Sequence, residues 1–289
     1  MKVIVTGAGG MLGRAQAAYC STRGDEVAAY DHYALDIAST SQVSETLEKE
    51  EPEVVINCAA WTDVDGCESD VTRANAANVV GPEVLAQACR KIGALLITIS
   101  TDYVFDGTKV GFYTQRDQPN PQSVYARTKL DGERRAQNAW ARTIVVRTGY
   151  IFGAGGNNFL STIIPRAQRG EQLKAIDDMF GTPTYSEDLV KRLYELAQLD
   201  LPGIYHVTND GPGASFADFA QAALSAARLD PASVTVVSLD SLQRPAQRPR
   251  NSRLKCILSP AVGLDPLRNW EDALKAFVRS LPKEAAIAR

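Results

Sequence analysis

Apolar and polar positions alternate between two kinds of segment over the first half of the chain. Short runs of apolar, largely β-branched residues predict buried strands, which fall at 2–6, 26–30, 53–57, 94–99 and 143–147. Between them, longer amphipathic segments predict helices at 11–22, 39–51 and 70–91, the last one softly interrupted at Gly81-Pro82, and a fourth helix that contains Tyr125. Strands that alternate with helices and read as continuous apolar runs indicate a parallel sheet covered on both faces.

The pattern loosens after residue 150. Helices are expected at 186–199, 215–228 and 271–281, another in the segment that starts at Asn157, and short strands at 173–176 and in G-I-Y-H-V. We therefore predict one domain at 1–150 and a smaller α/β lobe at 151–289. Parts of this C-terminal lobe are expected to return to the first sheet.

Composition narrows the range of functions. The 289 residues carry a net charge of −3, which gives no basic surface for a nucleic-acid partner. No apolar run approaches the about 20 residues that a membrane helix needs. The five cysteines lack C-x2-C spacing, and the short polar N-terminus does not resemble a signal peptide. These features predict a cytoplasmic protein without a zinc or other metal site.

A glycine-rich turn follows the first predicted strand. Gly7, Gly10 and Gly13 have G-x-x-G-x-x-G spacing and open the helix at 11–22. Glycines allow the backbone to approach a pyrophosphate closely, and the helix N-terminus offers free N–H groups. Asp31 ends the second strand, where an acidic residue usually accepts hydrogen bonds from the adenosine ribose. The alternatives are an ordinary tight turn and a capping aspartate.

Thr101, Tyr125 and Lys129 are candidate catalytic residues. Tyr125 and Lys129 are four residues apart, which places them on one face of a helix. A neighbouring ammonium lowers the pKa of a phenol, so this pair could donate a proton to a carbonyl oxygen. Thr101 follows the apolar run at 94–99, so its hydroxyl is expected at the carboxyl edge of the sheet, where ligands bind. Taken alone, the Tyr–Lys pair could also be a chance pair on a solvated helix.

The chain resembles the extended short-chain dehydrogenase/reductases, and within them the dTDP-4-dehydrorhamnose reductase family. The glycine loop T-G-A-G-G-M-L-G and the Tyr-x3-Lys of V-Y-A-R-T-K are common to the superfamily. Further stretches that match the family are N-C-A-A-W-T-D-V-D-G-C-E, S-T-D-Y-V-F-D-G, R-T-G-Y-I-F-G, G-N-N-F, F-G-T-P-T, G-I-Y-H-V and R-P-R-N-S-R-L. Of these, S-T-D-Y-V-F-D-G, F-G-T-P-T and R-P-x-N-S are the narrow ones. The matches span nearly the whole sequence, and the resemblance implies a Rossmann-type doubly wound fold, with a dinucleotide-binding domain at 1–150 and a lobe at 151–289 that mainly binds substrate.

The resemblance also implies a reaction, in which NADPH or NADH reduces the C4 keto group of a dTDP-linked 4-keto-6-deoxy sugar. Thr101, Tyr125 and Lys129 would be catalytic, and Thr101, Asp102, Tyr150 and Arg248 would contact the substrate. The expected cofactor contacts, including the loop glycines and the small residues after the third strand, are Gly7, Gly10, Met11, Leu12, Gly13, Asp31, Asp36, Ile37, Ala59, Ala60, Trp61, Thr62, Tyr125 and Lys129.

The chain departs from the family at two places. Tyr150 stands where a tryptophan is common, which affects sugar selectivity, and Ala15 stands where some members carry a metal-binding carboxylate. We therefore expect a monomer or a homodimer that forms without metal. Arg248 belongs to an arginine-rich loop that either is solvated or holds the substrate diphosphate.

Two other functions remain open at this point. One is a non-catalytic, NAD(P)-binding regulatory subunit of the same fold. The other is a nucleotide-sugar epimerase or dehydratase, although Tyr103 follows Asp102 where a dehydratase usually has a second acid.

Overall fold

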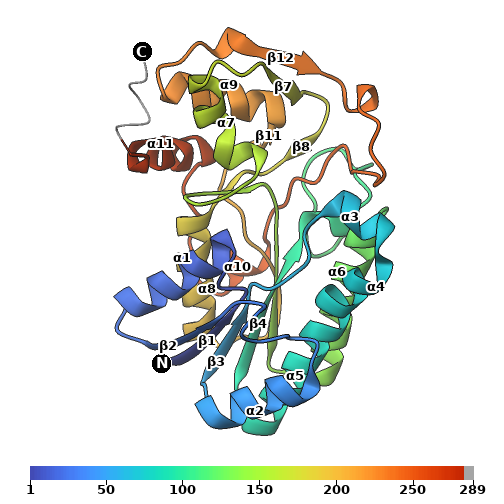
Figure 1. Cartoon of the computed structure of the whole chain (residues 1–289), viewed down its shortest axis with the longest axis vertical. Helices are drawn as coiled ribbons and strands as arrows, with labels where there is room; N and C mark the ends of the chain where they lie inside the picture. Colours follow the sequence, from blue (N-terminus) through green and yellow to red (C-terminus); the bar gives the residue numbers. More distant parts are fainter. Residues whose placement is uncertain (283–289) are drawn as a thin grey trace.

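A six-stranded, fully parallel sheet forms the centre of the computed structural model, which describes residues 1–282 (Figure 1). Its strand order is β10-β5-β4-β3-β1-β2. The strands are β1 (Lys2–Thr6), β2 (Glu26–Tyr30), β3 (Val54–Asn57), β4 (Leu95–Thr101), β5 (Thr143–Thr148) and β10 (Gly203–His206). The order reverses direction between β1 and β3, and ligands bind at such a switch point in open α/β sheets. The predicted Rossmann-type doubly wound fold is confirmed.

Helices cover both faces of this sheet because successive strand residues point to opposite sides. Val3 and Val5 pack on one side with the leucines of α8 (Ser186–Leu199), and α1 (Met11–Thr22) lies beside α8. Ile4 packs on the other side, against α2 (Thr40–Glu50), α5 (Gly81–Ile92) and α6 (Val124–Ala139). Both faces are therefore buried, as the continuous apolar strands predict.

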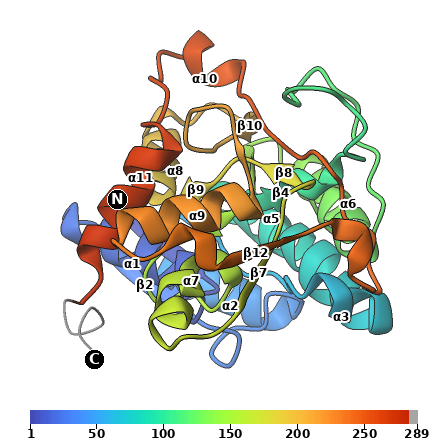
Figure 2. The same ribbon diagram turned by 90° about the horizontal axis from the view of Figure 1, so that it is seen from above.

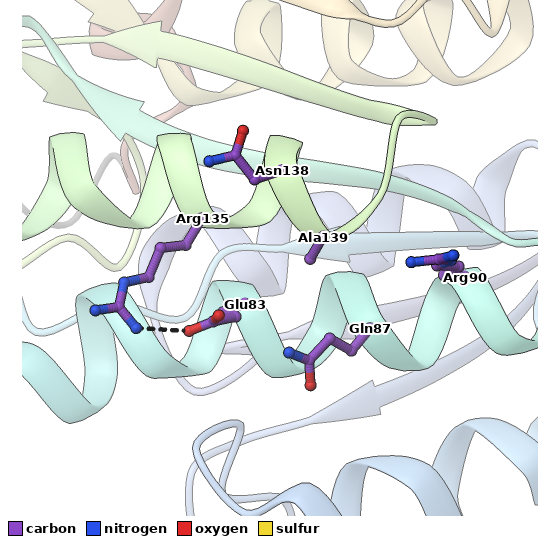
Figure 3. Close-up of a pocket in the computed structure, with 6 residues that line it drawn as sticks. All are labelled: Glu83, Gln87, Arg90, Arg135, Asn138 and Ala139. Carbon is purple, nitrogen blue, oxygen red and sulfur yellow. Dashed lines mark hydrogen bonds and ion pairs between the residues drawn. The ribbon is translucent and has the colours of Figure 1, made fainter.

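The helices α5 and α6 lie side by side (Figure 3). Arg135 on α6 donates to Glu83 on α5 over 2.9 Å, across a shallow polar groove of about 420 Å³. Gly132 allows the close approach of α6 to the turn before α5, since a Cβ atom there would lie 2.0 Å from the carbonyl oxygen of Asn78. The helix α6 is therefore packed closely along α5 and the turn that precedes it.

The predicted helix at 70–91 is confirmed as a continuous helical run, which consists of α4 (Val71–Asn75), a π-helical turn η1 (Ala76–Val80) and then α5. The interruption expected at Gly81-Pro82 is this π-helical turn, directly before Gly81. A short additional helix, α3 (Val64–Ser69), precedes the run and was not predicted. Asp70 separates α3 from α4, and its side chain accepts from the backbone N–H of Arg73. Gly81 and Pro82 begin α5, where proline needs no hydrogen-bond acceptor for its nitrogen.

A smaller lobe lies over the carboxyl ends of the strands (Figures 1 and 2). Its core is rich in aromatic residues such as Phe152, Phe219 and Phe277. Its elements are β6 (Ile151–Phe152), α7 (Phe159–Gln168), β7 (Leu173–Ile176), β8 (Phe180–Gly181), β9 (Thr184–Tyr185), β11 (Ala214–Ser215), α9 (Phe216–Ala226), β12 (Val234–Val237) and α11 (Trp270–Ser280). The short helix α10 (Leu258–Ala261) packs against the core of the central sheet instead.

Two further segments of the C-terminal half belong to the central sheet and not to the lobe. The strand β10 pairs with β5, from Gly203 opposite Ile144 to His206 opposite Arg147. The helix α8 packs on the sheet beside α1. The division at residue 150 stays a prediction, and the chain crosses between the two parts more than once. Within residues 1–282, no helix has both the length and the apolar character that crossing a membrane requires.

Candidate active site

A cavity of about 560 Å³ lies between the carboxyl ends of the strands and the lobe. It begins at the glycine loop, passes the ends of β4 and β5, and reaches the first turns of α7 and α9. The predicted site residues that line it are Gly10, Met11, Leu12, Gly13, Ala60, Thr62, Thr101, Asp102, Tyr125, Lys129 and Tyr150. Residues from both halves of the sequence therefore form one site.

The glycine loop is packed as a phosphate-binding turn requires. Gly7 has a φ of +69°, and a Cβ atom there would lie 2.6 Å from the backbone nitrogen of Ala59. A Cβ at Gly13 would lie 2.2 Å from the carbonyl oxygen of Gly7. No side chain caps the N-terminus of α1, and Gly10 and Met11 line the cavity there. Free N–H groups and the positive end of the helix dipole fit the pyrophosphate of a dinucleotide.

Six of the expected cofactor contacts lie outside the cavity lining: Gly7, Asp31, Asp36, Ile37, Ala59 and Trp61. Asp31 approaches the loop at Gly9, and its Oδ1 atom accepts from the backbone N–H groups of Tyr33 (2.9 Å) and Ala34 (3.0 Å). This places Asp31 at the end of the site where a ribose would lie. The exposed Asp36 accepts from the backbone N–H of Ala38.

Ile37 and Trp61 have structural contacts of their own. Ile37 is buried and packs so tightly against α5 that a Cβ atom on Gly81 would lie 2.4 Å from it. Trp61 exchanges hydrogen bonds with Asn78, through its backbone N–H (2.9 Å) and carbonyl (3.0 Å), and the guanidinium of Arg73 covers its ring. Gly7 and Ala59 lie directly against each other beneath the loop.

The catalytic candidates come from two elements. Thr101 is the last residue of β4, and its hydroxyl oxygen accepts from the backbone N–H of Tyr103 over 3.2 Å. Tyr125 and Lys129 project from α6, whose N-terminus is capped by the side chain of Ser123. Lys129 Nζ donates to the carbonyl oxygen of Ile99 over 2.7 Å. All three catalytic candidates are buried and face the same cavity.

Burial controls the ionisation of this pair. It lowers the pKa of Lys129 to about 8, while the negative charge of Glu133 opposes that shift. It raises the pKa of the Tyr125 phenol, with the Thr101 side chain opposing. The expected lowering of the Tyr125 pKa by Lys129 is therefore not found in this arrangement, because desolvation outweighs it and the ammonium is directed at Ile99.

Asp102 is buried beside Thr101, from which it accepts a hydrogen bond of 3.1 Å, and it also accepts one from Ser252. Burial raises the pKa of its carboxyl group to about 7, although both hydroxyls oppose the shift. Gly149, the residue after β5, leaves room for the Asp102 side chain, since a Cβ atom on Gly149 would lie 2.3 Å from the carboxyl carbon of Asp102.

Tyr150 forms an aromatic wall of the cavity. Its backbone has a φ of +48°, its ring centroid lies 4.5 Å from that of Phe216, and its hydroxyl donates to the carbonyl oxygen of Met179 over 3.2 Å. A Cβ atom on Gly181 would lie 2.4 Å from this ring, which fixes its position. The aromatic surface expected at this place is therefore present.

Arg248 does not line the main cavity. Its guanidinium makes a two-pronged ion pair with Asp65, at 2.9 and 2.8 Å, which lowers the pKa of that carboxyl group. Together with Arg244 it borders an adjoining cavity of about 140 Å³. The two cavities share the side chains of Tyr103, Phe159 and Phe216, so Arg248 lies next to the site but not in it.

Several lining residues were not among the predicted ones. Ser100 is the second-last residue of β4, Cys58 is the first residue after β3, and Phe216 is the first residue of α9. Asn157, Asn158 and Phe159 belong to the quoted motif G-N-N-F, so the motif itself was the available signal. Nothing local in the sequence marks Phe216, which reaches the cavity only through the folding of the lobe.

A doubly wound sheet, a glycine loop against an uncapped helix, and a buried threonine, tyrosine and lysine around one cavity define a short-chain dehydrogenase/reductase. Residues 1–282 match the family model described as the RmlD substrate binding domain, and the chain belongs to this family. It is 41% identical over 277 residues to a dTDP-4-dehydrorhamnose reductase of Streptomyces griseus, covering 94% of this chain and 91% of the relative.

Solved structures agree with this family. A crystal structure of a dTDP-4-dehydrorhamnose reductase from Clostridium acetobutylicum superposes with a TM-score of 0.92 at 36% identity, covering 96% of this chain and 99% of that chain. Another, from Bacillus anthracis and in complex with NADP, gives 0.93 at 32% identity, covering 97% of this chain and 100% of that chain.

Proposed function

We propose that the protein is an NAD(P)H-dependent dTDP-4-dehydrorhamnose reductase, which reduces the C4 keto group of dTDP-4-dehydro-6-deoxy-L-mannose and forms dTDP-L-rhamnose. The observation that carries the proposal is the placement of Thr101, Tyr125 and Lys129 in the cavity that begins at the glycine loop. A proton donor and a dinucleotide-binding turn thereby face the same space, as reduction of a carbonyl requires.

Thr101, Tyr125 and Lys129 would each have a different role in the reaction. When bound, the reduced nicotinamide supplies the hydride that reaches C4 of the sugar. Thr101 would turn its hydroxyl proton from Asp102 to the substrate carbonyl oxygen and orient that oxygen by a hydrogen bond. Tyr125 then donates its phenolic proton to the oxygen as negative charge develops there. Its raised pKa keeps the phenol protonated at neutral pH, and the Lys129 ammonium stabilises the phenolate left after transfer.

The remaining lining residues suit a nucleotide-linked sugar. Asp102 offers a carboxyl group beside Thr101, and Tyr150 offers a ring against which a deoxy sugar can pack. The adjoining cavity combines Arg244 and Arg248 with apolar side chains such as Ile176, a combination that suits a diphosphate and a base. Arg248 would share its guanidinium between Asp65 and the phosphate oxygens.

The two other functions are less consistent with this geometry. A regulatory subunit has no need of a buried catalytic set around a cavity. A dehydratase needs a second acid directly after Asp102 for its elimination. This chain has Tyr103 at that place, and its ring packs edge-on against the ring of Tyr125, with 6.2 Å between the ring centroids. We place the enzyme in the cytoplasm, as a monomer or a homodimer that forms without metal, with no nucleic-acid or membrane partner.

The direct test mixes purified protein with dTDP-4-dehydro-6-deoxy-L-mannose and either NADPH or NADH. Nicotinamide absorbance should fall, and chromatography should show dTDP-L-rhamnose in equal amount. The C3,C5 epimer, dTDP-4-dehydro-6-deoxy-D-glucose, serves as the matched control and should react much more slowly. No oxidation of either cofactor with the L-mannose substrate, by a protein that binds the cofactor, would refute the proposal.

A further inference from the structure

Three side chains form a buried polar cluster behind the catalytic residues. Glu133 on α6 is 3% exposed, and Arg147 on β5 is 4% exposed. Arg147 Nη2 lies 2.7 Å from Glu133 Oε2, and its Nε atom lies 3.0 Å from Oε1. Ser100 on β4 also donates to Oε1 and is paired with Arg147 across the sheet. The Glu133 carboxylate is thus held from two strands at once.

This cluster meets the catalytic site along one stretch of β4. The carbonyl oxygen of Ile99 accepts from Lys129 Nζ, and the hydroxyl of Ser100 donates to Glu133. The next residue is Thr101. Lys129 and Glu133 are one turn apart on α6, so they lie on the same face of the helix. Three consecutive residues of one strand therefore position the ammonium, the carboxylate and the catalytic hydroxyl.

Stability alone does not explain such a cluster. Removing two full charges from water costs free energy that their mutual attraction repays only in part. An apolar pair of the same size would fill this space at least as well. The buried ion pair is, however, close to the buried ammonium of Lys129. Loss of hydration lowers the pKa of Lys129, and the charge of Glu133 is the main influence that raises it again.

The charged and titratable groups around Lys129 come from several elements. The carboxylate of Glu133 and the phenol of Tyr125 are on the same helix, the thiol of Cys58 follows β3, and the carboxyl group of Asp102 follows β4. Arg147 stands behind Glu133 on β5. Of these groups, Glu133 is the one held in place by both an ion pair and a hydroxyl.

We propose that Glu133 is a positioning residue for the catalytic lysine: fixed by Ser100 and Arg147, its carboxylate keeps the Lys129 ammonium charged and directed at the carbonyl of Ile99. Glu133 touches neither substrate nor cofactor in this arrangement, because it is absent from the cavity lining. The proposal rests on the role given to Lys129 in the proposed function.

The test follows the charge of Lys129 directly, in protein labelled with ¹³C at the lysine ε-carbon and without cofactor. Lys129→Met identifies the resonance by its loss. In Glu133→Gln the titration midpoint of Lys129 should move to lower pH by about 1 to 3 units, the usual effect of one neighbouring opposite charge. In Arg147→Met it should move to higher pH, because the remaining carboxylate is no longer neutralised.

Two further variants keep the test decisive. Glu133→Gln combined with Arg147→Met removes both charges of the ion pair together, so neither is left without the other, and its midpoint should also lie below that of the wild type. Asp200→Asn breaks the ion pair with Arg142 (2.7 Å), outside the cavity, and should leave the midpoint in place. An unchanged Lys129 midpoint in folded Glu133→Gln or in the double variant overturns the proposal. An equal shift of the midpoint in all variants, including Asp200→Asn, also overturns it, because the effect would then be a general structural one.

Activity separates this inference from the proposed function. The alkaline limb of the kcat/KM profile should move with the Lys129 midpoint. If the Lys129 midpoint shifts in Glu133→Gln while the alkaline limb of the kcat/KM profile stays in place, the catalytic role of Lys129 is wrong but the role of Glu133 stands. If neither shifts, the role of Glu133 is wrong.

Discussion

The hydroxyl of Thr101 donates to the Oδ1 atom of Asp102, its neighbour in the chain, over 3.1 Å. The hydroxyl of Ser252, 150 residues away, donates to the other oxygen of the same carboxyl group. Asp102 is thereby fixed beside the catalytic threonine, where only 3% of its surface is exposed. Because burial raises its pKa to about 7, this carboxyl group titrates near neutral pH.

This leads to a prediction about stability. The pKa of Asp102 in the folded protein lies above 3.8, the usual value for an aspartate, so the folded protein binds the proton more tightly than the unfolded one. The stabilisation is full below about pH 4, is lost as the pH rises to about 7, and is of the order of 4 kcal/mol. Asp102→Asn removes this contribution to the pH dependence.

Urea denaturation at pH 5, 6, 7 and 8 checks the prediction. The difference in unfolding free energy between wild type and Asp102→Asn should change in favour of the variant as the pH rises to 7. Parallel curves for the two proteins would show that the carboxyl group is ionised throughout.

Replacement of the proton donor should abolish most of the activity. Tyr125→Phe keeps the ring and removes the hydroxyl, and loss of general acid catalysis typically costs about 10² to 10⁴ in rate. Steady-state kinetics and circular dichroism should show low kcat in a folded protein. Tyr113→Phe is the matched control, since it removes a buried hydroxyl that donates to Asp106 outside the cavity. Wild-type turnover by Tyr125→Phe would exclude it as the acid.

Asp31 predicts the choice of cofactor. Its carboxylate would repel a 2′-phosphate, and the next residues, His32-Tyr33-Ala34, supply no arginine. We expect use of both cofactors, with NADH at least as good as NADPH. Asp31→Asn retains an acceptor for the N–H groups of Tyr33 and Ala34, so it should raise kcat/KM for NADPH relative to NADH about tenfold, or about 1.4 kcal/mol. A strict requirement for NADPH in the wild type would contradict this prediction.

Assembly is expected to be independent of divalent cations. Ala15 occupies the helix position after the glycine loop where a metal-binding carboxylate would be needed. Glu187, at the start of α8, could match a second carboxylate ligand of those family members, but alone it would bind a hard cation weakly. Light scattering should give the same mass with and without EDTA, and activity should be equal in both. A dimer that dissociates on chelation is the contrary result.

The sheet could be predicted from the sequence because its signals are local. The expected bounds of α1 coincide with those of the structure, since a glycine turn and an amphipathic run define both ends of the pattern. The turn η1 could not be predicted in this way. It depends on contacts with distant residues: the side chain of Asn78 bonds the backbone of Trp61, and its carbonyl lies against Gly132.

The same distinction applies to the candidate site. Thr101, Tyr125 and Lys129 were recognisable from spacing and motif, and the structure brings them to one cavity. The contact of Glu133 with Arg147 depends on the pairing of β4 with β5, which no local pattern reveals. The pairing of Arg248 with Asp65, 183 residues apart, is likewise set by the lobe.

The position of β10 affects how the chain folds as it is synthesised. Until Gly203–His206 has emerged, β5 is the outermost strand of the nucleotide-binding sheet, with a row of unpaired backbone groups along one side. Its residues Ile144, Val145 and Val146 are apolar, so this edge is prone to pair with other chains. A fragment that stops at residue 150 would therefore contain the glycine loop and the catalytic residues and yet aggregate. The C-terminal half serves as the closing strand of the sheet as well as one wall of the cavity.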